Sequence, residues 1–286
     1  MAKKTSINLH TTTFSTDSIV KGKTPSKISY TRGQSKFTGT TIFTDEKIFD
    51  GSVDKTNSTK KVAWITKSKS TDSSYYDTRN WNKLDTKFDA ILTYDATLLK
   101  TYKNAHLIPS GGVTVDKTNS YKLKDGGREK NPDLKLISMI YSNNNTTDGQ
   151  KLRHTLASKL PYYDGYGDGA GKAIANKSTG LTNYLFSVCI EKSQEDNQFS
   201  DHLLDAFATS TVPIYWGPSN IKDYFDVSGI IILDDPNNLR EVIEKLNTTY
   251  WWEYENRKSA IASNYTAALN YEITDDWIYD NIISKL

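Results

Sequence analysis

The feature that most constrains the fold is a regular alternation of short apolar runs with segments of helical length. The runs are rich in Val, Ile, Leu and aromatic residues, and turn-forming residues follow most of them. This alternation is typical of parallel strands in a sheet that helices cover on both faces. We predict strands over residues 61–66, 88–95, 105–112, 134–143, 184–191, 211–217 and 229–233.

Helical patterns fill the intervals between the predicted strands. The clearest has leucines every four residues and begins at Thr147 or Asp148, either of which can cap a helix. The first sixty residues, rich in Lys, Thr and Ser, give no clear pattern. We predict helices over residues 146–160, 199–210 and 237–247, and one or two closing helices within 250–286.

These elements indicate an α/β protein of two units. The chain has 286 residues, of which 36% are hydrophobic, and this is enough apolar material for two cores. We expect an N-terminal domain over 1–145, a ligand-binding domain over 146–270 and a closing helix over 271–286. Ligands of open α/β sheets bind beyond the carboxyl ends of the strands, so we expect a site there.

Several kinds of site and location are disfavoured by the sequence. The single cysteine, Cys189, lies in an apolar run and is predicted to be a buried thiol without a disulfide. The four histidines show no metal-ligand spacing, so we expect neither a metal nor another cofactor. No apolar window is long enough to span a bilayer, and the N-terminus has no apolar signal region. We therefore expect no membrane partner and a cytoplasmic location, which is the host cytoplasm if a phage encodes the chain.

A motif stands out in residues 184–226. The segment YLFSVCIEKSQEDNQFSDHLLDAFATSTVPIYWG resembles the donor-binding signature of the α1,3-fucosyltransferase family, F-x-x-x-F-E-N-S, Y-x-T-E-K-[LI]-x-D-A and [TV]-[VI]-P-[IV]-Y-W-G. Upstream, residues 142–169 resemble the family's S-N segment, its arginine-bearing helix and its Gly-rich stretch. The first 130 residues match only loosely.

The resemblance implies a GT-B-like fold, in which two Rossmann-like domains face each other across a cleft. It also implies that the C-terminal domain binds a nucleotide-sugar without a metal. The nucleotide-sugar is then a co-substrate rather than a cofactor. The implied reaction is inverting transfer of its sugar to an acceptor hydroxyl.

The donor contacts of the family can be carried over residue by residue. There, the helix arginine and the lysine of T-E-K contact the donor diphosphate, and the glutamate of T-E-K contacts the ribose. Elementary chemistry agrees, because a departing diphosphate needs cations or helix N-terminal amides when no metal is present. The resemblance predicts donor contacts from Ser142, Asn143, Arg153, Glu191, Lys192, Ser193, Asp201 and His202.

This chain departs from the family at some of these positions. Lys192 replaces the family's Asn, and Asp201 and His202 replace the Glu and Lys of T-E-K. We interpret Lys192 as supplying the cation that is lost at position 202. The shorter Asp201 leaves the identity of the donor open. Arg153 could instead be an exposed surface residue, and Asp201 a helix N-cap.

An inverting transferase also needs a base near the acceptor hydroxyl. The family takes a glutamate from the loop after an early strand, but the corresponding loop here, residues 64–77, has lysines at that place. Asp72 in this loop and Asp95 after the next strand are the available carboxylates. We favour Asp95, which could alternatively cap the following helix.

The charge distribution bears on the acceptor. Residues 1–130 hold 23 Lys and Arg against 13 Asp and Glu, whereas the rest of the chain holds 13 against 21. A basic acceptor half suits a polyanion, and the Lys-, Asn- and Tyr-rich composition suits an AT-rich phage genome. Our first hypothesis is therefore glycosylation of hydroxymethylated phage DNA. The alternatives are a saccharide acceptor, a non-catalytic nucleotide-sugar or nucleic-acid binding protein, and a basic N-terminal region that is merely solvated or flexible.

Overall fold

The computed structural model describes residues 3–14, 18–20, 22–108, 111–116 and 124–286. It divides into two compact units. The first unit comprises residues 1–110, 196–198 and 273–286, and the second comprises 111–195 and 199–272. The boundary thus lies at 110–111 rather than at 145–146, because the strand before the predicted boundary pairs within the second sheet. The closing segment, from residue 273, belongs to the first unit.

The first unit is built on a parallel six-stranded sheet with the order β2-β1-β3-β4-β5-β6. Three of its strands lie in the first sixty residues, for which we predicted no elements. Pairing along both edges of β1 stabilises this part of the sheet. The strands are β1 (Thr5–His10), β2 (Ile28–Arg32), β3 (Thr40–Thr44), β4 (Lys60–Trp64), β5 (Ala90–Thr93) and β6 (Ala105–Leu107).

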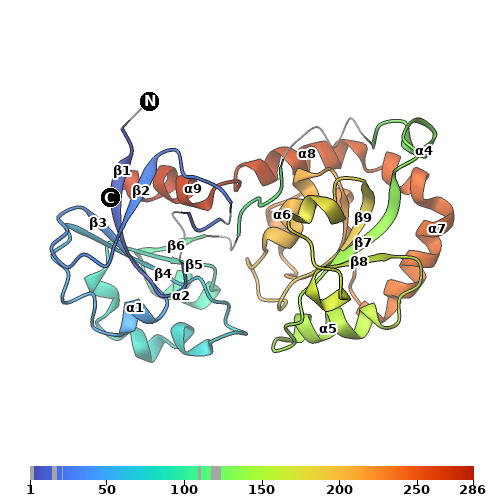
Figure 1. Ribbon diagram of the computed structural model, residues 1–286. Helices are drawn as coiled ribbons and strands as arrows, with labels where there is room; N and C mark the ends of the chain where they lie inside the picture. The colour runs from blue at the N-terminus through green and yellow to red at the C-terminus, as the bar shows by residue number, and fades with distance from the viewer. Residues whose placement is uncertain (1–2, 15–17, 21, 109–110, 117–123) are drawn as a thin grey trace. The chain divides into compact units, whose positions relative to one another are not determined.

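Helices cover both faces of this first sheet (Figure 1). One face packs against α9 (Thr274–Asn281), which contributes Ile278 to the apolar cluster. The other face packs against α1 (Glu46–Phe49) and α2 (Ala96–Thr101). Neighbouring residues of one strand, such as Ile42 and Phe43, belong to the two different clusters, as the alternation of side chains in a strand requires.

The second unit has a parallel five-stranded sheet with the order β11-β10-β9-β7-β8. Four of these strands match predicted runs. The fifth, β8, uses a Gly-rich stretch that was not predicted as a strand. The strands are β7 (Lys135–Ile140), β8 (Asp164–Tyr166), β9 (Tyr184–Ile190), β10 (Val212–Trp216) and β11 (Ile231–Ile232).

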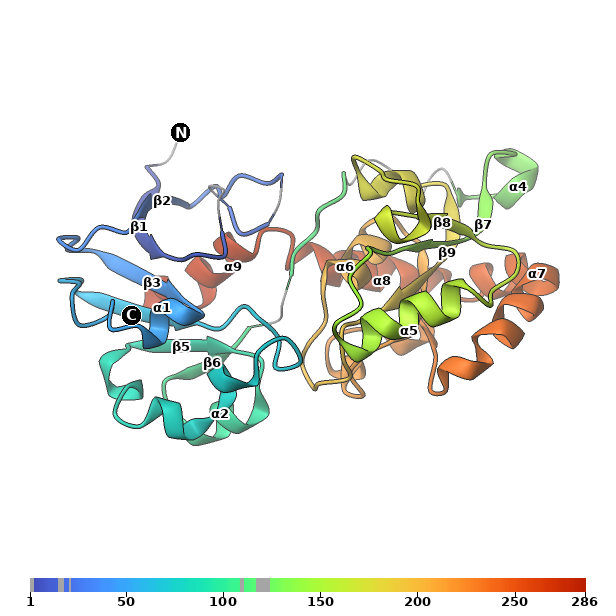
Figure 2. The ribbon, with the colours of Figure 1, turned by 60° about the horizontal axis from the view of Figure 1, so that its bottom comes forward.

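Two pairs of helices enclose the second sheet (Figures 1 and 2). On one face lie α5 (Asp148–Ala157) and α7 (Leu239–Glu255), and on the other α6 (Asp201–Ala208) and α8 (Lys258–Leu269). The short α4 (Gly127–Lys130) precedes β7. Helix α5 begins with a capping box between Thr147 and Gln150, which confirms Thr147 as its cap.

Other predictions can be compared with the described residues. Cys189 is a buried free thiol, and burial raises its pKa to about 12. Within the described ranges, no group of three His, Cys, Asp or Glu side chains has an arrangement that could hold a metal ion. None of the helices in the part of the chain that the structure describes is long and apolar enough to cross a membrane.

Candidate functional site

The order of the second sheet marks a ligand crevice. After β7 the chain passes through α5 to β8 on one side, whereas β9 pairs with β7 on the other, so the strand order reverses between β7 and β9. Ligands of open α/β sheets bind at such a reversal, outside the carboxyl ends of the strands. Helices α5 and α6 begin beside this point, and most of the predicted donor contacts follow β7 or β9.

The first turn of α5 lies directly on the end of β9. The backbone N–H of Gly149 donates to the carbonyl oxygen of Lys192 over 2.9 Å. A Cβ atom at position 149 would lie 1.7 Å from the carbonyl oxygen of Glu191, so only glycine allows this approach. The contact brings the start of α5 to the residues that end β9.

Arg153 lies on the inner face of α5 and is only 5% exposed, so it is not a surface arginine. Its Nε donates to the carbonyl oxygen of Ile190 over 2.9 Å, and Nη2 donates to the same oxygen. Burial lowers the pKa of Arg153, but an arginine remains charged. The structure therefore holds a buried cation against the end of β9.

Glu191, the first residue after β9, connects the sheet to the start of α6 by a hydrogen bond. Its Oε1 accepts a hydrogen bond from the backbone N–H of Ser200 over 2.9 Å and one from the Tyr215 hydroxyl over 3.4 Å. The side chain is buried, and burial raises the pKa of Glu191. Because both α5 and α6 contact this residue or its neighbour, two helix N-termini converge beside it.

Asp201, the first residue of α6, forms an ion pair with Lys177 that the sequence did not indicate. Ser200 caps the helix in its place, so the capping alternative for Asp201 is wrong. The same Lys177 Nζ lies 3.1 Å from Asp205, which is fully buried. Although burial raises the pKa of Asp201, Lys177 lowers it further, so the carboxylate stays ionised. Residue 177 lies 24 positions before Asp201, too far for a local pattern to link them.

His202 and Lys192 differ in their capacity to carry positive charge. Burial and the neighbouring cations Arg153 and Lys177 hold the pKa of His202 well below its ordinary value. His202 is therefore neutral at neutral pH and cannot replace a lysine charge. Lys192 is exposed and makes no side-chain hydrogen bond or ion pair within the described part of the chain.

The remaining predicted donor contacts lie in loops at the same edge of the sheet. Ser142 and Asn143 follow β7, and the Ser142 hydroxyl accepts from the Asn144 backbone over 3.4 Å. Ser193 follows Lys192 in the loop after β9 and is half-buried. The structure thus gathers the predicted residues around the carboxyl ends of β7 and β9.

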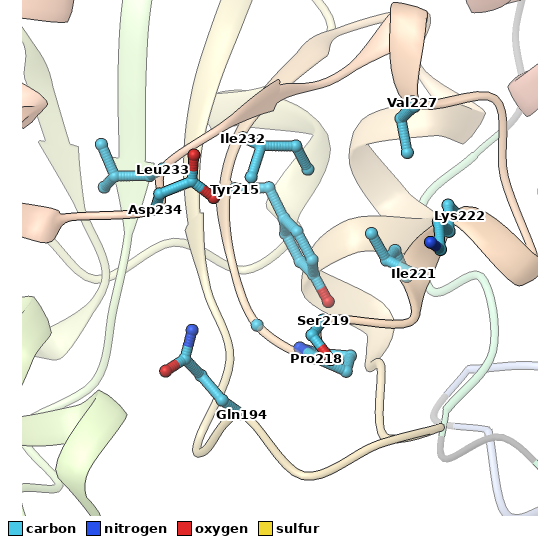
Figure 3. Close-up of a pocket in the computed structure, with 11 residues that line it drawn as sticks. Gln194, Tyr215, Pro218, Ser219, Ile221, Lys222, Val227, Ile232, Leu233 and Asp234 are labelled. Carbon is cyan, nitrogen blue, oxygen red and sulfur yellow. The ribbon is translucent and has the colours of Figure 1, made fainter.

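A cavity of about 310 Å³ opens beyond β10 and β11, and no predicted site residue lines it. Tyr215 stands in the middle of the lining, and its hydroxyl reaches Glu191 (Figure 3). Apolar side chains form much of the wall, and exposed polar groups stand at its margin. The lining comprises Gln194, Tyr215, Gly217, Pro218, Ser219, Ile221, Lys222, Val227, Ile232, Leu233 and Asp234.

The predicted bases of the first unit both have structural tasks. Asp95 caps α2 through the backbone N–H of Leu98 over 2.9 Å and pairs with Lys69 over 3.2 Å. Asp72 caps a short 3₁₀ helix through the backbone N–H of Ser74 over 3.0 Å. Hydrogen bonds from Ser74 lower the pKa of Asp72. The N-cap alternative for Asp95 is confirmed, and a catalytic role for either residue stays a prediction.

No family model matches the chain. It is 24% identical over 196 residues to the α-(1,3)-fucosyltransferase FucT of Helicobacter pylori, an alignment that covers 59% of this chain and 40% of the relative. It is 25% identical over 143 residues to human 4-galactosyl-N-acetylglucosaminide 3-α-L-fucosyltransferase 9, covering 49% and 38%. The chain is homologous to the α1,3-fucosyltransferases. It spans about two fifths of the length of these curated relatives.

Solved structures agree with the fold of this fucosyltransferase homologue. An α1,3-fucosyltransferase crystallised with GDP-fucose has a TM-score of 0.57 at 17% identity, covering 93% of this chain and 90% of that one. The Anabaena protein HepE in complex with UDP-glucose has a TM-score of 0.57 at 8% identity, covering 86% and 79%. These likenesses confirm the predicted GT-B-like α/β fold.

Proposed function

We propose that this fucosyltransferase homologue is a glycosyltransferase. In this proposal it moves a sugar from a nucleotide-sugar to an acceptor hydroxyl, with inversion and without a metal. The observation that carries the proposal is the convergence of the α5 and α6 N-termini on Glu191 and Lys192, with the buried Arg153 beside them. Helix N-termini and an arginine together provide the positive environment that a leaving diphosphate needs.

Each charged group of the site has a role in this proposal. Arg153 binds the diphosphate, and its Nη1 makes no hydrogen bond to another described residue. Lys192, exposed and unpaired within the described ranges, adds the second cation. Asp201, kept ionised by Lys177, accepts hydrogen bonds from the ribose hydroxyls. Neutral His202 can contribute a hydrogen bond but no charge.

The cavity beyond β10 suits the uncharged, hydroxyl-bearing sugar of the donor. Its apolar wall can pack against a sugar ring, and Gln194 and Asp234 can bind hydroxyls at its margin. Neither of these two side chains has a hydrogen-bond partner among the described residues. Because Tyr215 connects this cavity to Glu191, a donor whose diphosphate lies at Arg153 would have its sugar within reach of the cavity.

The charge of the structural units favours a saccharide acceptor over a polyanion. Counted over the units, the first holds 19 Lys and Arg against 14 Asp and Glu, and the second 17 against 20. The formal net charge is +10 when it is counted over residues 1–130, but only +5 when it is counted over the first unit. Aspartate or glutamate neutralises many of the lysines of the first unit, in the pairs Lys27–Asp280, Lys47–Asp50, Lys60–Asp89, Lys67–Glu46, Lys69–Asp95 and Lys87–Asp54.

A saccharide acceptor also agrees with the name of the human relative, a 4-galactosyl-N-acetylglucosaminide 3-α-L-fucosyltransferase. DNA remains the second candidate on the strength of the residual positive charge alone. The salt dependence of binding distinguishes hydroxymethylated DNA from a saccharide as the acceptor. Only DNA should lose affinity steeply as the salt concentration rises.

The test is incubation with GDP- and UDP-sugars in the presence of galactosyl-N-acetylglucosamine glycans or hydroxymethylated duplex DNA, with EDTA throughout. Mass spectrometry identifies a glycosylated product, and NMR gives the configuration of its anomeric carbon. We expect transfer in EDTA with an inverted product. If the chain binds none of these donors in calorimetry and transfers no sugar, the proposal is refuted.

A further inference from the structure

The topology of the first unit points to a ligand crevice of its own. Strand β1 pairs with β2 on one side and with β3 on the other, so the strand order reverses between β1 and β3. By the rule that located the donor crevice, a ligand of this unit binds beyond the carboxyl ends of these two strands. Asp95 follows β5, two strands away from this reversal.

Two acidic residues follow β3 at this point, and the first has an unusual backbone. Asp45 has φ 48° and ψ −118°, a conformation that costs a residue with a side chain about 1–3 kcal/mol. It is fully buried, and its carboxylate accepts from the backbone N–H groups of Thr66 and Lys67 over 2.8 and 3.1 Å. The Thr13 hydroxyl donates to it over 3.0 Å. Asp45 therefore joins three segments and fixes the direction in which the chain enters α1.

The next residue, Glu46, is held with its carboxylate partly exposed. Its Oε2 lies 3.2 Å from Lys67 Nζ and 3.4 Å from the Tyr75 hydroxyl, while about a third of the side chain remains accessible. No other described side chain donates to it. Asp72 and Asp95 each cap a helix through the backbone N–H of a later residue, whereas the Glu46 carboxylate interacts with no backbone N–H except its own.

We propose that Glu46 is the general base of the transfer reaction. Its carboxylate takes the proton of the acceptor hydroxyl as that oxygen bonds to the anomeric carbon of the donor. The bond from this carbon to the phosphate oxygen breaks, and the nucleoside diphosphate leaves with the electron pair. Glu46 ends as a carboxylic acid and loses its proton to water. This inference rests on the proposed function.

The surroundings of Glu46 include one lysine of the loop after β4. Lys67 comes from that loop and holds the carboxylate ionised and oriented. Burial raises the pKa of Glu46, but its own backbone N–H and Lys67 lower it further, so the pKa lies below its ordinary value. The other titratable groups that interact with this cluster are Lys47, Asp72 and Tyr75.

The experiment compares transfer by the wild-type chain with that by Glu46→Gln and Glu46→Asp. Loss of a general base reduces the rate by about 10²–10⁴-fold, so we expect a fall of this size in kcat for Glu46→Gln, with a smaller fall for Glu46→Asp. The dissociation constant of the donor should not change. Glu241→Gln, an exposed glutamate on α7, is the matched control.

A pH profile distinguishes a base from a merely structural residue. Lys67→Met removes the cation that lowers the pKa of Glu46, so the acidic limb of kcat/KM should move to higher pH. Asp72→Asn, Asp95→Asn and His10→Asn test the rival bases, since His10 ends β1 at the same reversal. An undiminished rate in a folded Glu46→Gln variant, or a larger loss in one of the rivals, overturns the assignment. A wild-type chain that transfers no sugar overturns the proposed function as well.

Discussion

Lys177 offers a quantitative test of the ion-pair cluster at the start of α6, because one ammonium group neutralises two carboxylates. Its side chain is 24% exposed, that of Asp201 36%, and that of Asp205 is fully buried. Replacement by methionine keeps most of the side-chain volume but leaves Asp205 buried without its cation. Breaking a buried ion pair costs about 3–5 kcal/mol. Since Lys177 is partly exposed, we expect a loss at the lower end of this range, about 3 kcal/mol, in the free energy of unfolding.

The pH dependence of this loss follows from the signs of the shifts. Lys177 holds the pKa of Asp201 below its ordinary value, so the stabilisation is present above the unfolded-state pKa of an aspartate and is lost as pH falls. Burial already raises the pKa of Asp205, and without Lys177 this residue should take up a proton more readily. The difference between variant and wild type should therefore be largest at neutral pH and shrink below about pH 4.

Urea unfolding followed by tryptophan fluorescence at pH 7 and at acidic pH measures both effects. Lys258→Met is the control in the same unit, since it removes an exposed pair in which Nζ lies 2.9 Å from Asp125. Exposed pairs contribute at most about 1 kcal/mol. If Lys177→Met costs no more than Lys258→Met, or if its cost does not fall in acid, the reasoning about the buried cluster is refuted.

Three further predictions concern the proposed donor crevice. Arg153→Lys keeps the charge but loses the paired hydrogen bonds to the Ile190 carbonyl, so we expect the nucleoside diphosphate to bind about 10-fold or more weakly in calorimetry. Equal binding by Arg153→Lys and by the wild-type chain would show that the paired hydrogen bonds of the guanidinium do not contribute to diphosphate binding. Gly149→Ala places a methyl group against the Glu191 carbonyl and should lower stability by about 1–3 kcal/mol in chemical denaturation, as well as weakening donor binding. An unchanged denaturation midpoint for Gly149→Ala would contradict the close contact between Gly149 and the Glu191 carbonyl. Because the pKa of His202 is well below its ordinary value, donor affinity should show no step near pH 6.5, and a step that His202→Gln removes would mean that His202 is charged.

The sequence predicted the second unit well because its signals are local. A run of apolar residues followed by a turn, or a cap followed by leucines at helical spacing, acts over a few neighbouring residues. The motif that ends in TVPIYWG led to Glu191, which follows β9. The upstream match led to Arg153 on α5, whose guanidinium contacts the end of the same strand. The strands before residue 60 escaped prediction because polar Thr, Ser and Asn alternate with few apolar side chains there.

The sequence alone determined the α/β class, most of the strands and the place of the donor motif. Tertiary structure decided the rest, because those features depend on contacts between distant residues. The pairing of β7 with β9 set the boundary between the units, and the ion pair of Lys177 with Asp201 supplied a partner that no motif contains. The order of the strands puts the reversal of the first sheet beside Asp45 and Glu46 rather than at Asp95. The net charge of the first unit also depends on the fold, because aspartates near the C-terminus of the chain belong to this unit.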